Sequence, residues 1–208
     1  MKIYDITKTI NKDLKVWPGD KEYERNESSF ELKDMTGHSS WITASLHTGT
    51  HVDAHWHYDS KGMSIEKHDL NNYIGKCQVI DVSHTKDKHI KIEDLRVDIS
   101  EERILFKTSN HMDETKWDDN FKGISVALIH FLNDHGVKLI GIDTPSVDIY
   151  NAETLSSHQA LYNCDIYNIE GLVLNDVPEG VYELIALPLK IEGADGSPVR
   201  AVLLEYEK

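Results

Sequence analysis

The stretch LHTGTHVDAHWHY, Leu46–Tyr58, concentrates side chains that can bind metal ions or transfer protons. Four of the 12 histidines of the chain and one aspartate lie between His47 and His57. Neutral imidazole and carboxylate groups are good ligands for divalent ions such as Zn²⁺ and Mn²⁺. Imidazole also takes up and releases protons near neutral pH. These residue types indicate a metal centre, a proton-transfer site or both, and a solvated polar loop is the alternative.

The backbone conformation of this stretch determines which of its side chains converge. A helix would place His47, His51 and His55 on one face, but the threonine, glycine and valine residues between them are poor helix formers. In an extended chain side chains alternate, so all four histidines and Asp53 point the same way. Gly49 lets the backbone bend, so that His47 and His51 can bind one ion. We therefore predict an extended or loop conformation with a metal site.

Motifs of other metal sites and hydrolases do not match this sequence. A zincin needs HExxH on a helix and an α/β-hydrolase esterase needs GxSxG, and the chain contains neither string. The string nearest to GxSxG, GISVA at 123–127, lacks the second glycine. His55 and His57 form the HxH of a cupin, but Lys61 and Gly62 stand where its glutamate would be expected.

The elements that must position these residues follow from hydrophobic periodicity. Two stretches predict helices, Gly123–His135 with a stop at Gly136, and Ala152–Asn163 with Asn151 as its cap. The string IEDLR at 92–96 predicts a short helical turn. Alternating or apolar runs predict strands at Ile3–Ile10, Ser40–Leu46, Cys77–Val82, Arg103–Lys107, Lys138–Asp143, Tyr167–Leu174, Tyr182–Leu189 and Val199–Tyr206. The order of these elements predicts one α/β domain over residues 1–208, with helices packed on a mixed or barrel-like β core.

Charge and composition limit the partners of the chain. The formal net charge of -14 disfavours binding to nucleic acid and to anionic membranes. No apolar run approaches the roughly 20 residues of a membrane span, and the N-terminal MKIYDITKTI alternates like a strand instead of forming a signal-peptide core. Cys77 and Cys164 stand apart, as buried thiols of a reduced compartment do. We expect a cytoplasmic protein that acts on a small molecule.

The string HTGTHVDAHWH resembles the HxGTHxDxPxH signature of the cyclase-like metal-dependent hydrolases. Bacterial kynurenine formamidases and isatin hydrolases belong to this family. The resemblance continues in VWPGD near the N-terminus, in GIDTPSVD, in SSHQALYNCDIYNIEGLVL and in YELIALPLKIEGADGSPVRAVL. Together these segments span nearly the whole chain. One position departs from the signature, because His55 stands where the family has proline.

The resemblance implies a centre of two divalent ions, zinc or manganese. His47 and His51 would bind the first ion, and Asp53 would bridge both ions. His158 would bind the second ion, and Glu170 would be the other bridging carboxylate. The implied fold is a compact β/β/α domain of the swivelling type, usually a homodimer with its pockets near the subunit interface.

The resemblance also implies the reaction. His57 would be the acid/base residue, and Trp17 would line the substrate pocket. The implied activity is hydrolysis of N-formyl-L-kynurenine to L-kynurenine and formate by a metal-activated water, a step of tryptophan degradation. Another cyclic amide, a lactone or an isatin-like compound is the alternative substrate. A protein that binds metal and a small ligand without catalysis is the alternative class.

Some of these residues have other interpretations when the sequence is taken by itself. His158 would be an ordinary histidine on a half-exposed helix. Glu170 lies on an apolar strand and needs a partner there, which could be a metal or Arg200. Trp17 could be a core or interface aromatic. His55 could be a neutral loop substitution, or it could add an imidazole to the active face and alter the pocket.

The segment His84–Asp119 is rich in charge and carries no motif that predicts a role.

Overall fold

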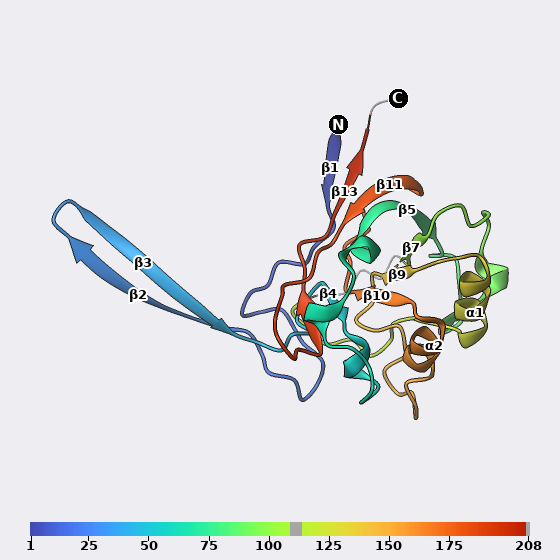
Figure 1. Cartoon of the computed structure of the whole chain (residues 1–208), viewed down its shortest axis with the longest axis horizontal. Coiled ribbons are helices and arrows are strands. Elements are labelled where there is room, and N and C mark those ends of the chain that lie inside the picture. The colour runs from blue at the N-terminus through green and yellow to red at the C-terminus, as the bar shows by residue number, and fades with distance from the viewer. Residues whose placement is uncertain (109–113, 207–208) are drawn as a thin grey trace.

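The computed structural model describes residues 1–108 and 114–206. Within these ranges, nine strands form one curled sheet in the order β1-β13-β11-β5-β7-β9-β10-β4-β12 (Figure 1). The strands are β1 (Lys2–Asp5), β4 (His51–Asp53), β5 (Ile74–Asp81), β7 (Arg103–Lys107), β9 (Leu139–Ile142), β10 (Tyr167–Glu170), β11 (Gly180–Ile185), β12 (Gly196–Pro198) and β13 (Val202–Glu205).

The sheet is parallel in its middle and antiparallel at both sides. Strands β5, β7, β9 and β10 pair in parallel, whereas β1, β13 and β11 continue it antiparallel on one side and β4 and β12 on the other. Parallel strands are usually covered on both faces and therefore read as continuous apolar runs. Strand β9, LIGI, is buried throughout. The mixed α/β fold class predicted from the sequence is confirmed.

Helices α1 (Val126–Asp134) and α2 (Ser156–Cys164) lie together on one side of the parallel strands (Figure 1). Three apolar residues of α1, Leu128, Ile129 and Leu132, are buried in one cluster with apolar residues of β5, β7 and β9. A second cluster of buried apolar residues includes Val52 of β4 and Ile169 of β10. The α1 helix ends as predicted, since His135 is its C-cap and Gly136 has a φ of 77°.

The predicted start of the second helix is wrong. Helix α2 begins at Ser156, and its N-cap residue is Leu155, which makes no side-chain cap. The carboxylate of Asp148 takes over the capping role that we predicted for Asn151. It accepts hydrogen bonds from the backbone N–H groups of Ser157 (2.9 Å) and His158 (3.1 Å). This cap comes from a segment that precedes the helix by several residues, so helix-start rules did not locate it.

Short elements complete the fold. The 3-10 helices are η1 (His55–His57), η2 (Ile65–Lys67), η3 (Leu70–Tyr73) and η4 (Ile92–Asp94), and η4 confirms the helical turn predicted at 92–96. Strands β6 (His89–Ile90) and β8 (Gly123–Ile124) pair in parallel. None of the helices in the described ranges is both long and apolar enough to cross a membrane.

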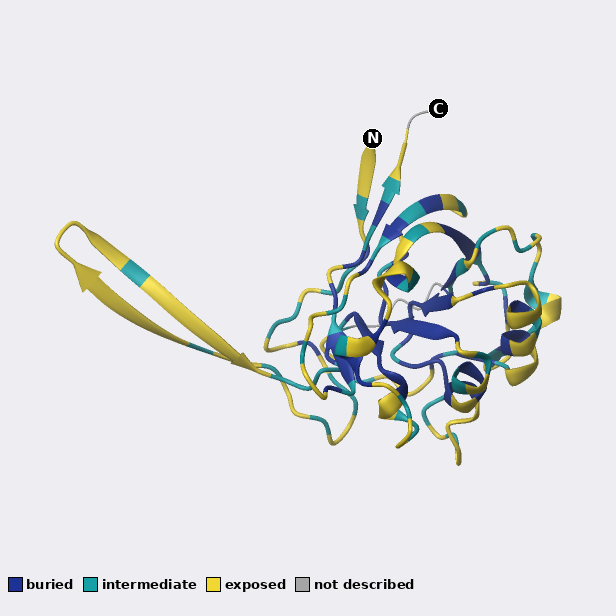
Figure 2. Cartoon of the chain, in the orientation of Figure 1, coloured by how far each residue is buried: buried dark blue, intermediate teal, exposed yellow. Residues whose placement is uncertain are grey.

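A long hairpin leaves the body of the molecule. Strands β2 (Glu24–Leu32) and β3 (Met35–Thr43) pair along their whole length, and they project as an arm whose residues are almost all exposed (Figures 1 and 2). Strand β3 begins five positions before the predicted strand Ser40–Leu46, and β2 was not predicted. Most of the arm mixes polar and apolar residues without the strict alternation that predicts a half-buried strand.

Candidate metal centre

The sheet brings the two halves of the predicted site together. Strand β4 pairs antiparallel with β10, and this register sets Glu170 directly opposite His51. The hydroxyl of Thr50 donates a hydrogen bond of 2.7 Å to the carbonyl oxygen of Gly171. Gly171 has a φ of 68°, and a Cβ there would lie 2.3 Å from the carbonyl oxygen of Gly49. Glycine therefore permits the close approach of the segment that carries His51 to the segment that carries Glu170.

Asp53 lies between two groups of possible ligands. Its Oδ1 atom is 2.8 Å from Nδ1 of His47 and 3.5 Å from Nε2 of His51. Its Oδ2 atom is 3.3 Å from Nε2 of His158, which is also 3.3 Å from Oε1 of Glu170. His51 and Glu170 connect the two groups, because Nε2 of His51 lies 3.4 Å from Oε2 of Glu170.

Both groups have the dimensions of a metal site. His47, His51 and Asp53 each offer one ligand atom within 4.8 Å of the others, and so do Asp53, His158 and Glu170. Asp53 belongs to both groups. The structure thus brings together all five residues for which the sequence predicts a role as metal ligands.

The ring nitrogens that face away from these groups are held by oxygen atoms. Nδ1 of His158 is 2.7 Å from Oδ2 of Asp148, Nε2 of His47 is 3.2 Å from Oδ2 of Asp195, and Nδ1 of His51 is 3.2 Å from the carbonyl oxygen of Gly49. Metal-binding histidines typically donate their second ring N–H to a carboxylate or a carbonyl, which fixes the tautomer and the ring orientation. All three histidines have such a partner.

One buried atom shows that these residues fit a metal ion. Nε2 of His158 is buried and makes no hydrogen bond, although it lies 3.3 Å from carboxylate oxygens of Asp53 and of Glu170. Buried polar atoms without a partner are rare and need an explanation. A cation bound between the imidazole and the two carboxylates supplies one, and this set of nitrogen and oxygen donors suits Zn²⁺ or Mn²⁺.

The electrostatics of the cluster favour positive charge. Burial by itself would raise the pKa of Asp53, but its interactions with the imidazole rings of His158, His47 and His51 hold the pKa of Asp53 well below its ordinary value. Burial would lower the pKa of His47 and His51. Their carboxylate partners outweigh it and raise the pKa of His47 to about 10 and that of His51 to about 9. A site that stabilises imidazolium so strongly also attracts a divalent cation.

His57 lies at the edge of the cluster, on the turn η1. Its side chain is 34% exposed, whereas the side chains of His51 and His158 are each 4% exposed. The ring centre of His57 is 4.1 Å from that of His47, and its Nδ1 atom is 3.5 Å from Oδ2 of Asp195. His57 therefore lies beside the predicted ligands and faces the pocket, where a proton carrier can meet a substrate.

Asp195 is a site residue that the sequence did not reveal. It lies in the string GADGSP at 193–198, part of a segment that resembles the family but in which no ligand or catalytic role was predicted. The carbonyl oxygen of Asp195 accepts a hydrogen bond of 2.8 Å from the N–H of Ala54, and β12 begins at Gly196, which pairs with Asp53. This pairing places the Asp195 carboxylate against His47 and His57, and hydrogen bonding to His47 lowers the pKa of Asp195 to about 2.

His55 does not point into the site. Strand β4 ends at Asp53 and the chain turns into η1, so the side-chain alternation predicted for the whole stretch fails after Asp53. The ring of His55 is buried and stacks on Tyr167 at 4.9 Å, and its Nε2 atom is 3.4 Å from the carbonyl oxygen of Ile166. The possible role of His55 on the active face is therefore wrong, and the substitution of the expected proline is accommodated behind the site.

The alternative partner of Glu170 is also excluded. Arg200 forms its ion pair with Asp5 on the surface of the protein. Oε1 of Glu170 instead accepts hydrogen bonds from the N–H of Val147 (2.9 Å) and the side-chain amide of Asn168 (3.2 Å).

A pocket of about 350 Å³ opens beside the cluster and is lined by His47, His51, His57, His158 and Glu170, among other residues. Trp17 lines this pocket, and the centre of its ring lies 5.3 Å from that of Trp117 and 5.2 Å from that of Tyr150. Trp117 belongs to the segment His84–Asp119, in which no motif was found. That segment nevertheless contributes part of the pocket wall, because Lys15 N–H donates to the carbonyl oxygen of Glu114 (2.9 Å) and so joins it to the N-terminal loop.

Comparisons with known proteins agree with this geometry. The sequence model of the family described as "Putative cyclase" matches residues 4–149. A kynurenine formamidase of Sphingopyxis alaskensis is 39% identical over 206 residues, which cover 98% of both chains. A kynurenine formamidase of Salinibacter ruber is 41% identical over 209 residues, which cover 98% of this chain and 97% of the relative.

Solved structures with the same fold include two informative ones. A protein described as a potential metal-dependent hydrolase with cyclase activity superposes with a TM-score of 0.85 at 31% identity, covering 100% of this chain and 99% of that chain. Isatin hydrolase A from Labrenzia aggregata, bound to benzyl benzoate, superposes with a TM-score of 0.81 at 25% identity, covering 99% and 94% of the two chains.

Proposed function

Because this chain belongs to the putative cyclase family, we propose that it hydrolyses N-formyl-L-kynurenine to L-kynurenine and formate. The chain is a hydrolase that acts on a C–N amide bond, like the kynurenine formamidases that it resembles over nearly its whole length. The observation that carries the proposal is the double cluster around Asp53, which opens into a pocket lined by tryptophan.

Five residues would hold two divalent ions. His47 and His51 would bind one ion, His158 would bind the other, and Asp53 and Glu170 would contact both. Ions bound there would lower the pKa of a water molecule and polarise the carbonyl group of the substrate. Zinc is our first choice and manganese the second, since both accept this set of ligands.

His57 would move the proton. The Asp195 carboxylate, 3.5 Å from Nδ1 of His57, favours the tautomer with the proton on Nδ1, which leaves Nε2 as an acceptor. During hydrolysis, water adds to the formyl carbon and the bond from this carbon to the aryl nitrogen breaks. Nε2 of His57 would take a proton from the attacking water and return it to the departing nitrogen, so that kynurenine leaves as a neutral aniline.

The aromatic wall of the pocket suits an aryl substrate. Trp17 and Trp117 meet edge to face, with their ring centres 5.3 Å apart, and such rings offer apolar area and specific ring–ring contacts. The formamide of an aryl ring held there would lie in the same pocket as His57.

An activity panel tests this proposal. Metal-free protein is loaded with Zn²⁺ or Mn²⁺ and assayed on N-formyl-L-kynurenine, isatin and an aryl lactone. We expect metal-dependent release of formate from N-formyl-L-kynurenine, with the highest kcat/KM of the panel. A preference for isatin would assign the related activity of the isatin hydrolases. Metal binding without turnover of any of the three compounds would favour a binding protein instead.

We also propose that the protein is a homodimer, and the hairpin arm supports this proposal. Strand alternation and the register of β2 with β3 place Phe30, Leu32, Met35 and Trp41 on one face of the arm, and each is 50% exposed or more. A two-stranded hairpin is marginally stable by itself, and apolar patches of this kind mark interaction sites. Light scattering coupled to size exclusion should report a dimer that Leu32→Ser combined with Trp41→Ser dissociates. A monomeric wild-type protein would contradict the proposal.

The cytoplasmic location and the role in tryptophan degradation stay predictions, which fractionation of cells and the kynurenine content of a deletion strain can test.

A further inference from the structure

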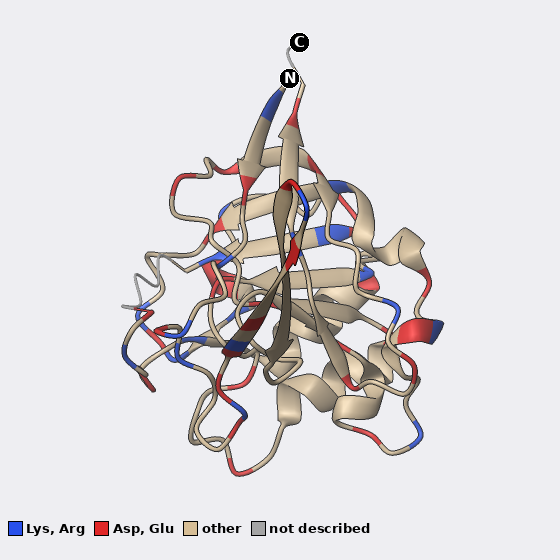
Figure 3. Cartoon of the chain, turned by 90° about the vertical axis from the view of Figure 1, so that its left-hand side faces the viewer, with Lys and Arg blue, Asp and Glu red and all other residues tan. Residues whose placement is uncertain are grey.

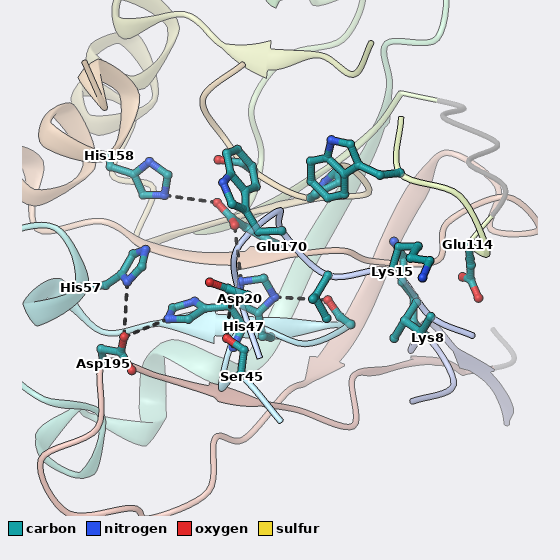
Figure 4. Close-up of a pocket in the computed structure, with 18 of the residues that line it drawn as sticks. Lys8, Lys15, Asp20, Ser45, His47, His57, Glu114, His158, Glu170 and Asp195 are labelled. Carbon is teal, nitrogen blue, oxygen red and sulfur yellow. Dashed lines mark hydrogen bonds and ion pairs between the residues drawn. The ribbon is translucent and has the colours of Figure 1, made fainter. Parts of the chain in front are cut away.

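The pocket beside the metal centre has a second charged end. Lys8, Lys15 and Glu114 lie at the end opposite to His57 and His158 (Figure 4). The chain carries a net charge of -14, and acidic and basic residues mix on the face from which the arm projects (Figure 3). Lys8, Lys15 and Glu114 therefore bring charges of both signs to one end of the pocket, in a chain that is acidic as a whole.

The position of Lys8 is tied to the metal centre. Its backbone N–H donates a hydrogen bond of 2.9 Å to Oγ1 of Thr50, and the same hydroxyl donates to the carbonyl oxygen of Gly171 at 2.7 Å. Thr50 precedes His51 and Gly171 follows Glu170 in the sequence. The backbone of Lys8 is thus fixed to both segments that carry the predicted ligands, and its side chain reaches into the pocket that they share.

The ammonium group of Lys8 lacks a close counter-ion. Burial lowers the pKa of Lys8, and the charges of Glu114 and Asp143 oppose that effect. Among the residues that the structure describes, no carboxylate oxygen forms an ion pair with Nζ of Lys8 at 4.0 Å or less. The carboxylate of Asp143 is already engaged by the N–H of Thr108 (2.9 Å) and its hydroxyl (2.6 Å). A desolvated ammonium in this position gains most from an anionic group of a ligand.

The other charged residues of this end complement Lys8. Lys15 contacts Glu22 at 3.6 Å in an exposed ion pair, which solvent weakens, so its charge remains available to a ligand. Asp20, which also lines the pocket, accepts a hydrogen bond of 2.9 Å from the hydroxyl of Ser45. Glu114 supplies a negative charge beside the two lysines. The end therefore presents positive and negative groups together, as a zwitterion requires.

We propose that Lys8, with Lys15 beside it, binds the carboxylate of the substrate's α-amino acid head group, while Glu114 faces its ammonium group. This inference rests on the proposed function and narrows the substrate class to aryl formamides that carry a zwitterionic side chain. The formamide occupies the histidine end of the pocket and the amino acid occupies the lysine end. Aryl formamides without the head group bind through the aromatic wall alone.

A comparison of two substrates tests the role of Lys8. The zinc-loaded wild type and the variant Lys8→Met are assayed on N-formyl-L-kynurenine and on 2-formamidoacetophenone, which keeps the aryl ketone and lacks the amino acid. We expect the ratio of the two kcat/KM values to fall about 10- to 100-fold in Lys8→Met, mainly through KM, as for the loss of a charge-assisted hydrogen bond. Lys8→Arg should restore part of the ratio. Lys12→Met, which removes an exposed lysine paired with Asp13, is the matched control and should leave the ratio unchanged.

Lys15→Met is a second variant in case Lys8→Met folds poorly, because the Lys15 side chain is 42% exposed. We expect it to lower the same ratio by a smaller factor. Equal losses on both substrates, or an unchanged ratio in both variants, would overturn the assignment.

A binding measurement separates this inference from the proposed function. Calorimetry with L-kynurenine and with 2-aminoacetophenone needs no turnover. If Lys8→Met bound L-kynurenine more weakly than the wild type does but bound 2-aminoacetophenone equally well, this would support the head-group site. The conclusion would hold even if neither formamide were hydrolysed. Absence of hydrolysis by the zinc-loaded wild type would contradict the proposed function, whereas equal affinities of wild type and Lys8→Met for L-kynurenine would contradict the head-group site.

Discussion

The variant Asp148→Asn tests whether the metal centre depends on how His158 is oriented. The Asp148 carboxylate is 2% exposed and accepts three hydrogen bonds, from Nδ1 of His158 at 2.7 Å, from the N–H of His158 at 3.1 Å and from the N–H of Ser157 at 2.9 Å. An asparagine amide has a single acceptor oxygen, so its NH₂ group must face at least one of these donors.

Each orientation of that amide has a consequence for the metal. If the NH₂ group faces Ser157, the start of α2 loses an acceptor. If it faces His158, Nδ1 becomes the acceptor and the ring proton moves to Nε2, the atom that points at Asp53 and Glu170. Loss of such an orienting partner typically weakens metal affinity about 10- to 100-fold, which corresponds to about 1.4 to 2.8 kcal/mol.

Zinc affinity is measured by competition with a chromogenic chelator at pH 7.5, and thermal unfolding of the metal-free proteins is followed in parallel. Asp143→Asn is the matched control, because Asp143 is also buried, bonds to Thr108 instead of a histidine, and has a pKa raised to about 6 by burial. We expect wild-type zinc affinity in Asp143→Asn and reduced affinity in Asp148→Asn. Equal affinities in the two variants would refute the role of Asp148.

Three further predictions concern the histidines. His57→Ala should retain wild-type zinc content by elemental analysis while kcat falls about 10²- to 10⁴-fold; a wild-type rate would remove His57 from proton transfer. Asp195→Asn should lower kcat more than it changes KM and should weaken zinc binding, and Asp195→Ala should lower both further; an effect on KM alone would contradict its contacts with His47 and His57. The free energy of unfolding of the metal-free protein should fall as the pH rises above about 6.5, the ordinary pKa of histidine. The folded state raises the pKa of His51 to about 9 and that of His47 to about 10. Protonated His51 and His47 therefore stabilise the folded state at low pH, and this stabilisation is lost as the pH passes through these values. Excess Zn²⁺, which binds neutral imidazole, should stabilise the protein increasingly over the same range, and urea titrations that show no fall for the metal-free protein would contradict the expected sign.

Local patterns in the sequence predicted the position of β7 and the end of helix α1, because these features depend on residues close together along the chain. Strand β7 coincides with the predicted Arg103–Lys107, because a continuous apolar run can only be satisfied inside the sheet. Helix α1 ends where Gly136 follows it, since glycine adopts the positive φ that terminates a helix. His47, His51 and Asp53 are six positions apart at most, so their spacing alone indicated that they meet.

Other features depended on contacts between distant segments. His158 and Glu170 reach the centre because β10 pairs with β4 and because Asp148 holds the start of α2. Asp195 lies at the site because β12, which follows it, pairs with β4. Lys8 lies at the pocket because its backbone N–H bonds to Thr50. Neither residue belongs to a motif that predicts its place.

His55 shows the difference most clearly, because spacing grouped it with the ligands and the end of β4 at Asp53 turned it away. Side-chain direction repeats only while the backbone conformation continues. The sequence by itself determined which residue types could bind a metal and that one short stretch held them. The tertiary structure decided which of them converge, because strand pairing and burial set the direction of each side chain and bring together residues that lie far apart along the chain.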